Sequence, residues 1–111
     1  MSNLINKEMG LEFCMDDEEF YVEMLETYLE DSAEVVEFMK DAYANDDLGL
    51  YATKVHALKS TSKTIGAESL AELALELETA AKGNDLDTVK AKHDNCMTLY
   101  GDVVNAVREM L

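Results

Sequence analysis

Apolar residues recur at steps of three and four along most of the chain, a spacing typical of helices that bury one face. One clear case is the stretch from Leu48 to Ile65, in which Tyr51, Val55 and Leu58 follow one another at such steps. No stretch keeps the period-two alternation of a half-buried strand. The pattern therefore predicts an all-α protein.

Capping residues divide the chain into predicted helices. Asn6 would cap a short first helix, and Asp16 or Asp17 would cap the second. Asp31, followed three residues later by Glu34, resembles a capping box and predicts that a third helix begins there. The predicted helices cover about residues 7–13, 16–30, 31–44, 48–65, 67–82 and 86–110. We expect Leu11 and Phe13 to anchor the first of them.

Glycine and clusters of Asn and Asp mark the turns. The run at 45–47 ends one helix and caps the next. Gly66 ends or bends the helix over residues 48–65. At the run 83–85 one helix ends and the last one begins. Such short turns make neighbouring helices antiparallel. We therefore expect one domain over residues 1–111, an up-down antiparallel four-helix bundle with one or two short extra N-terminal helices.

The charge balance narrows the classes of function. The chain has 24 acidic and 9 basic residues, for a formal net charge of −15. Such acidity argues against nucleic-acid binding, which needs a basic surface, and repulsion between copies favours a monomer. No apolar run approaches the roughly 20 residues that span a bilayer, and the first residues lack the apolar core of a secretion signal. We therefore expect a cytoplasmic protein with no membrane partner.

Two cysteines and one histidine are expected to be core residues. Cys14 and Cys96 lie far apart in the sequence, and cysteines in a cytosolic helical domain are usually reduced. His93 falls on the apolar side of the last predicted helix, so we expect it to be partly buried and hydrogen-bonded. Only His93 and Cys96 are spaced like a pair of metal ligands, so no metal site is expected.

The other histidine, His56, stands in an unusual window. No Asp or Glu occurs over residues 48–67, although the whole chain has 24. At about 3.6 residues per turn, His56 lies on the flank or outer face of its helix, well away from the apolar stripe. Ser60 and Lys63 follow on the same side, and Lys59 is a neighbour three residues on.

This constellation is suited to carrying a phosphoryl group. Imidazole is a good nucleophile that is substantially neutral near pH 7. Lys59 and Lys63 can balance the charge of the incoming phosphoryl oxygens. A nearby carboxylate would repel that group, which gives a reason for the missing acids. The alternative interpretation is a solvated surface histidine among lysines that serve solubility.

The segment H-A-L-K-S-T-S-K-T-I-G-A-E-S-L, from His56 to Leu70, resembles the signature of histidine-containing phosphotransfer (HPt) domains. Their motif is His, two residues, Lys, Gly, five residues, Gly. His56, Lys59 and Gly66 match it, while Ser60 stands where the family usually has glycine. Serine is nearly as small and favours helix more than glycine does, so we expect the site to work.

The resemblance implies a phosphorelay intermediate. His56 would accept a phosphoryl group from an aspartyl phosphate on a receiver domain and pass it to another, and the partner could belong to a hybrid histidine kinase. The receiver would supply Mg²⁺, and this chain would hold no cofactor. Because there is no Gly-rich phosphate loop, we expect no kinase activity with ATP. Receivers dock such domains through apolar contacts, for which Phe13, Met15 and Phe20 are candidates.

Two other readings remain open. One is an HPt-like binding module that docks a receiver or kinase without transferring phosphate. The other is the dimerisation and phosphoacceptor bundle of a histidine kinase, which should bring two long helices and a seam between subunits.

Overall fold

The computed structural model describes residues 4–111, and all of its regular structure is helical. Its five helices are α1 (Lys7–Phe13), α2 (Glu18–Ala44), α3 (Leu48–Ile65), α4 (Glu68–Lys82) and α5 (Leu86–Met110). No strand occurs within residues 4–111. The all-α class is confirmed.

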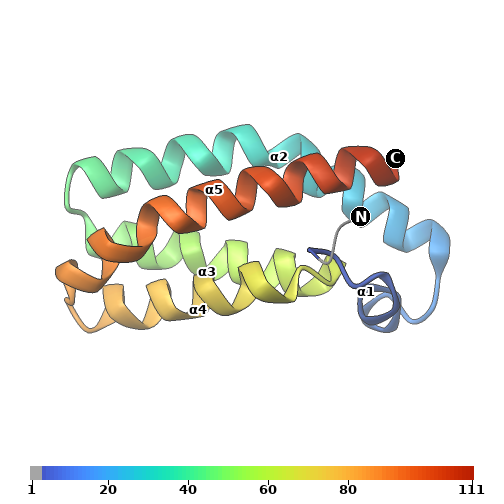
Figure 1. Ribbon diagram of the computed structural model, residues 1–111, viewed down its shortest axis with the longest axis horizontal. Helices are drawn as coiled ribbons and strands as arrows, with labels where there is room; N and C mark the ends of the chain where they lie inside the picture. Colours follow the sequence, from blue (N-terminus) through green and yellow to red (C-terminus); the bar gives the residue numbers. More distant parts are fainter. Residues whose placement is uncertain (1–3) are drawn as a thin grey trace.

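The four long helices lie side by side along the long direction of the molecule (Figure 1). Successive helices run in opposite directions, and α1 lies at the end where α3 stops and α4 starts. The most extensive contact joins α3 to α4, and α2 also packs on α3. As a result, α3 is supported by neighbours on two sides and leaves a third side free.

The helix boundaries follow the capping residues with one exception. Asn6, Asp17, Asp47 and Asp85 each accept a hydrogen bond from the backbone N–H three residues on, as expected of N-caps. The prediction that a helix begins at Asp31 is wrong, because α2 is one helix of 27 residues.

The continuity of α2 has a physical reason. Tyr28, Ser32 and Met39 are buried on the same face of α2 on both sides of the predicted break. An N-cap would require non-helical backbone at Asp31, which would turn the residues beyond it away from the core. Burial of one long face therefore outweighs the local capping signal.

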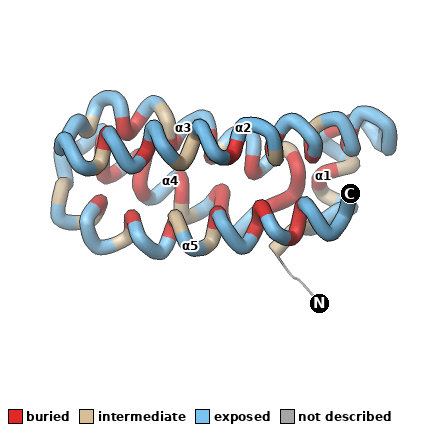
Figure 2. The backbone as a smooth tube through the Cα atoms, turned by 90° about the horizontal axis from the view of Figure 1, so that it is seen from above, coloured by how far each residue is buried: buried red, intermediate tan, exposed pale blue. Residues whose placement is uncertain are grey.

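Tyrosines fill much of the core and tie α2 to α3. The tube in Figure 2 is red along the inward sides of the helices, and Tyr21, Tyr51 and Tyr100 are the largest of the fully or almost fully buried side chains. Tyr21 donates its hydroxyl to the Ile65 carbonyl at 2.8 Å, and the Tyr28 and Ser62 hydroxyls are 2.8 Å apart. These bonds fix the position of α3 along α2.

Two further expectations about the core can be compared with the structure. Cys14 and Cys96 are both buried and unpaired, as expected. Leu11 is partly buried, but Phe13 is 48% exposed, so its assignment as an anchor of the first helix is wrong. Phe13 lies in the last turn of α1 and faces solvent. Within residues 4–111, no helix is both long and apolar enough to cross a membrane.

Gly66 ends α3 and contacts Asn6, the residue just before α1. Its φ of +90° lies in the left-handed region, where glycine has no steric penalty. The Asn6 N–H donates to the Gly66 carbonyl at 2.8 Å. A Cβ added at Gly66 would come within 2.1 Å of the Asn6 carbonyl oxygen. The glycine that matches the HPt motif is therefore a structural requirement of this junction.

Replacing Gly66 by alanine should lower the free energy of unfolding by at least about 2 kcal/mol, because strain at positive φ adds to the clash with Asn6. Gly101→Ala is the matched control: a Cβ there meets nothing within 4 Å. In the exposed interior of a helix it should stabilise by up to about 1 kcal/mol. Urea unfolding measures both changes. Equal effects of the two substitutions would contradict this account of Gly66.

Candidate functional site

His56 lies in the middle of α3 on the side that faces solvent. Its neighbour Val55 and the nearby Leu58 are buried, so the helical period turns the imidazole outward. The His56 side chain is 55% exposed. The expected placement on the outer face is confirmed.

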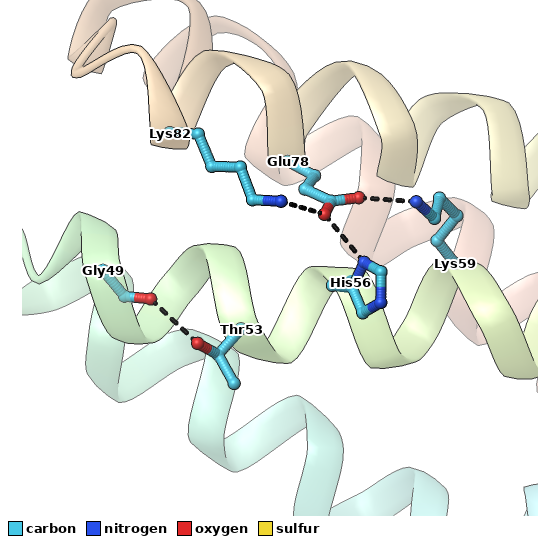
Figure 3. Close-up of polar contacts among 6 residues, drawn as sticks. All are labelled: Gly49, Thr53, His56, Lys59, Glu78 and Lys82. Atoms are coloured by element: carbon cyan, nitrogen blue, oxygen red, sulfur yellow. Dashed lines mark hydrogen bonds and ion pairs between the residues drawn. The ribbon is translucent and has the colours of Figure 1, made fainter.

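A carboxylate from the neighbouring helix, Glu78 of α4, lies next to the His56 ring (Figure 3). His56 Nδ1 is 2.7 Å from Glu78 Oε2. Lys59 donates to Oε1 at 2.8 Å, and Lys82 lies 2.8 Å from Oε2. The Glu78 side chain is only 4% exposed, so these three groups replace the water that a carboxylate normally holds.

The three donors keep Glu78 ionised. Burial by itself would raise the pKa of Glu78, but the hydrogen bonds from Lys59, Lys82 and His56 outweigh it and lower the pKa to about 2. With one carboxylate and two ammonium groups, the cluster has a net charge of +1 before His56 is counted. The site is therefore electropositive in a strongly acidic protein.

The contact with Glu78 also decides which nitrogen of His56 can react. A carboxylate only accepts hydrogen bonds, so Nδ1 must carry the proton. In the neutral imidazole, Nε2 then holds the free electron pair. Figure 3 shows that this second nitrogen points away from Glu78. The exposed atom of the site is thus a nucleophile.

The interpretation that the acid-free window keeps carboxylates away from His56 is wrong. The acid-free window covers α3 alone, and Glu78 reaches the site from α4, 22 residues further along the chain. Its charge is neutralised by the lysines, so it does not repel an anion as a free carboxylate would. One signal in the sequence could have found it, because Glu78 falls on the buried face of α4 between Ala74 and Ala81.

An open groove lies beside His56 between the start of α3 and the end of α4. Its volume is about 470 Å³, and His56 and Lys82 face each other across it. The remaining lining is small or apolar: Leu48, Gly49, Ala52, Thr53, Ala81 and Asn84. The groove therefore leaves one side of the His56 ring open to solvent.

Comparison with known proteins identifies the family. The sequence-family model of the Hpt domain matches residues 23–111. This chain belongs to the Hpt domain family. No curated protein sequence matches it.

Solved structures of Hpt domains share the fold. The HPT domain of a sensor hybrid histidine kinase from Shewanella superposes with a TM-score of 0.90 at 22% identity, over 97% of this chain and 93% of that one. The histidine-containing phosphotransfer protein B from Pseudomonas aeruginosa PAO1 gives 0.86 at 21% identity, over 99% and 96%. Hpt domains act in phosphorelays as histidine phosphotransfer carriers rather than as kinases, and they interact with receiver domains.

The other predicted site residues on α3 have different surroundings. Ser60 is exposed one turn beyond His56, and only its backbone is engaged, by the Thr64 hydroxyl at 2.9 Å. Lys63 is exposed and forms no ion pair within residues 4–111. Lys63 and Lys59 both line a second groove, between the end of α3 and the start of α4. The structure therefore brings Lys59 to the histidine site but leaves Lys63 free.

His93 has none of these properties. It is 3% exposed, its Nδ1 lies 2.8 Å from the Tyr51 hydroxyl, and its ring stacks on Tyr43 at 3.9 Å. Burial lowers the pKa of His93 and favours the neutral form. The expected hydrogen bond is confirmed, and His93 is more deeply buried than the partial burial that the sequence predicts. In the described part of the chain, no three His, Cys, Asp or Glu side chains are grouped so that they could hold a metal.

The Glu78 cluster should make the free energy of unfolding depend on pH in the acid range. Because the pKa of Glu78 is lowered from about 4.5 to about 2, its contribution to stability is complete above about pH 4.5 and is lost as the pH falls towards 2. Glu78→Gln should cost about 1–2 kcal/mol of unfolding free energy at pH 7. The difference from wild type should shrink across that acid range, as measured by urea unfolding at several pH values.

Glu72→Gln is the control, since Glu72 is exposed on the same helix and forms no ion pair among the described residues. Its unfolding free energy should stay within about 0.5 kcal/mol of wild type at every pH. A Glu78→Gln difference that does not change between pH 7 and pH 2 would refute the assignment.

Proposed function

We propose that Nε2 of His56 accepts a phosphoryl group from the aspartyl phosphate of a receiver domain and passes it to another receiver. The observation that carries this proposal is the pairing of His56 Nδ1 with the buried Glu78 carboxylate, which leaves Nε2 exposed as the nucleophile. His56 is also the histidine of the family motif.

The transfer balances without any other reactant. The electron pair of Nε2 attacks phosphorus, the bond from phosphorus to the aspartyl oxygen breaks, and the aspartate leaves as a carboxylate. The Nδ1 proton stays on the ring, which becomes positively charged, and Glu78 at 2.7 Å stabilises that charge. The same steps in reverse deliver the group to a second receiver.

The lysines give the site its affinity for an anion. Lys59 and Lys82 together exceed the charge of Glu78, so the arriving phosphoryl oxygens meet a net positive site. Lys63, with no ion pair among the described residues, can turn towards them at little cost. The receiver would supply Mg²⁺ to neutralise the transferring group, and this chain would need no cofactor.

Residues around His56 would form the docking surface. Ser60 is exposed one turn away and presents little bulk to an approaching backbone. Phe13, Met15 and Phe20 are 48%, 90% and 45% exposed, so they are available for apolar contacts with a partner. They belong to α1, the turn after it and the start of α2, at the end of the bundle beyond α3. The end of α3 is itself roughly 14 Å along the helix axis from His56.

We also infer that α2 to α5 form an up-down four-helix bundle and that the chain is one cytoplasmic domain that acts as a monomer. The alternating helix directions in Figure 1 support the first point. The net charge of −15 supports the last, because it makes two copies repel each other. Four long helices in one chain leave no need for the second subunit that the kinase dimerisation bundle requires.

The rival proposal is a binding module that docks a receiver without phosphotransfer. The observation in its favour is Ser60, whose hydroxyl occupies space that glycine would leave open. Substitution of the two histidines separates the proposals.

Incubation with a phosphorylated receiver should place an acid-labile, alkali-stable phosphoryl group on the wild-type protein. His56→Gln should abolish this label, with at least about a hundredfold loss, because no other exposed imidazole exists in the described chain. His93→Gln should retain it, because His93 is buried. Phosphate-affinity electrophoresis measures the product. Label that persists in His56→Gln would exclude His56, and an unlabelled wild type that still binds the receiver would favour the binding module.

The role of Ser60 can be tested by its size. Ser60→Gly should transfer within about tenfold of wild type, whereas Ser60→Leu should slow transfer from a receiver by more than about tenfold, because a large side chain blocks close approach. Phosphorylation by phosphoramidate, which needs no docking, should be similar in all three proteins. Thr98→Leu, at an exposed position of α5, is the control and should transfer like wild type. A Ser60→Leu protein that transfers normally would remove Ser60 from the docking surface.

A further inference from the structure

A crevice separate from the groove beside His56 opens between α2 and α3 and reaches Tyr100 of α5. Its volume is about 160 Å³. An apolar cavity of about 150 Å³ is large enough for a benzene-sized molecule. The crevice is therefore of a size to hold one small ring system.

The walls of the crevice are mainly apolar. Met24, Tyr28 and Val35 of α2 and Leu58 and Ile65 of α3 all line it. The Tyr28 hydroxyl is already paired with Ser62 at 2.8 Å. These walls offer dispersion contacts to a flat apolar molecule, and the other polar side chains of the lining are Thr27, Asp31, Thr61 and Tyr100.

One polar group in the crevice lacks a partner. Tyr100 is 2% exposed, yet its hydroxyl forms no hydrogen bond within residues 4–111. No fully enclosed polar side-chain atom of the described chain lacks a partner, so this hydroxyl reaches solvent, through the crevice or through the groove between α2 and α5, both of which Tyr100 lines. Burial, and after it the charge of Asp31 on the crevice wall, raises the pKa of Tyr100. Tyr100 and Asp31 both line the crevice, so a bound molecule would meet the hydroxyl and the carboxylate in one site.

We propose that this crevice is a binding site for a small, flat aromatic molecule with one hydrogen-bond donor. The ring would fill the space between Met24, Val35 and Leu58. Its N–H or O–H would donate to the Tyr100 hydroxyl or to the Asp31 carboxylate, both of which can accept. Anionic ligands are disfavoured, because Asp31 lies at the site and the chain has a net charge of −15.

The site is distinct from the phosphotransfer proposed for His56. None of its lining residues contacts Glu78, Lys59 or Lys82 through a hydrogen bond or ion pair. It does adjoin the same helix, because Ala57 and Leu58, which follow His56 directly, form part of its wall. Because the crevice does not use the Glu78 cluster, binding of a small molecule to it can be measured without a receiver and without phosphate.

Indole is a suitable probe, since it combines a flat ring system with one N–H, and benzene matches its ring without the donor. Titration of the isotope-labelled full chain with indole should shift the amide resonances of Asp31, Ala57 and Thr61 in a saturable manner. Tyr100→Phe should weaken indole binding by roughly 2- to 12-fold, the value of one hydrogen bond, and should leave benzene binding unchanged.

Val35→Phe fills the crevice and should weaken indole binding by more than about tenfold. Val36→Phe is the matched control, since the adjacent residue carries the same substitution into the groove between α2 and α5, which shares only Tyr100 with the crevice. Indole affinity should not change. Thr61→Phe, at the exposed rim, gives a second filling variant should Val35→Phe fail to fold.

Three results would overturn the proposal. Shifts that do not saturate up to the solubility limit of indole would show that no site exists. Equal effects of Val35→Phe and Val36→Phe would place binding elsewhere. Resonances of the crevice that ignore indole but respond to an added receiver would assign it to protein docking instead.

Discussion

The buried charge of Glu78 is the constraint on which the candidate site depends. A carboxylate that is 4% exposed is stable only if donors replace its water. His56 and Lys59 reach it from α3, and Lys82 reaches it from its own helix. The same contacts therefore join the two most extensively packed helices, hold the imidazole in one orientation and set the charge around it. A change in the packing of α3 on α4 would alter all three properties together.

Much of the fold could be predicted because its signals are local. Asp47 caps α3 through a bond to the N–H three residues on, and Gly66 ends it at positive φ, so both boundaries can be read from short stretches. The expected break at Asp31 failed for the opposite reason. A capping box is a weak preference of four residues, whereas the burial of Tyr28, Ser32 and Met39 on one face extends along the whole of α2. When the two conflict, burial of the longer face decides.

Only the part of the candidate site that lies on α3 could be predicted from the sequence. The period of α3 gave the outward direction of His56 and the position of Lys59 next to it. Glu78 was missed because its contact with His56 spans 22 residues and exists only after α4 packs on α3. Even so, an acid on the apolar face of α4 requires a buried partner. Placing that acid opposite a helix that contains lysines and no carboxylates would have indicated the cluster.

The two histidines of the chain show what separates a reactive imidazole from a structural one. Both use Nδ1 to hold the ring, His56 against Glu78 at 2.7 Å and His93 against the Tyr51 hydroxyl at 2.8 Å. Orientation alone therefore does not make a site. His93 is also covered by Tyr43, whereas nothing covers the outer side of His56, which is 55% exposed. Because Glu78 holds the ring through Nδ1, the nucleophilic Nε2 is fixed in position and still open to a partner.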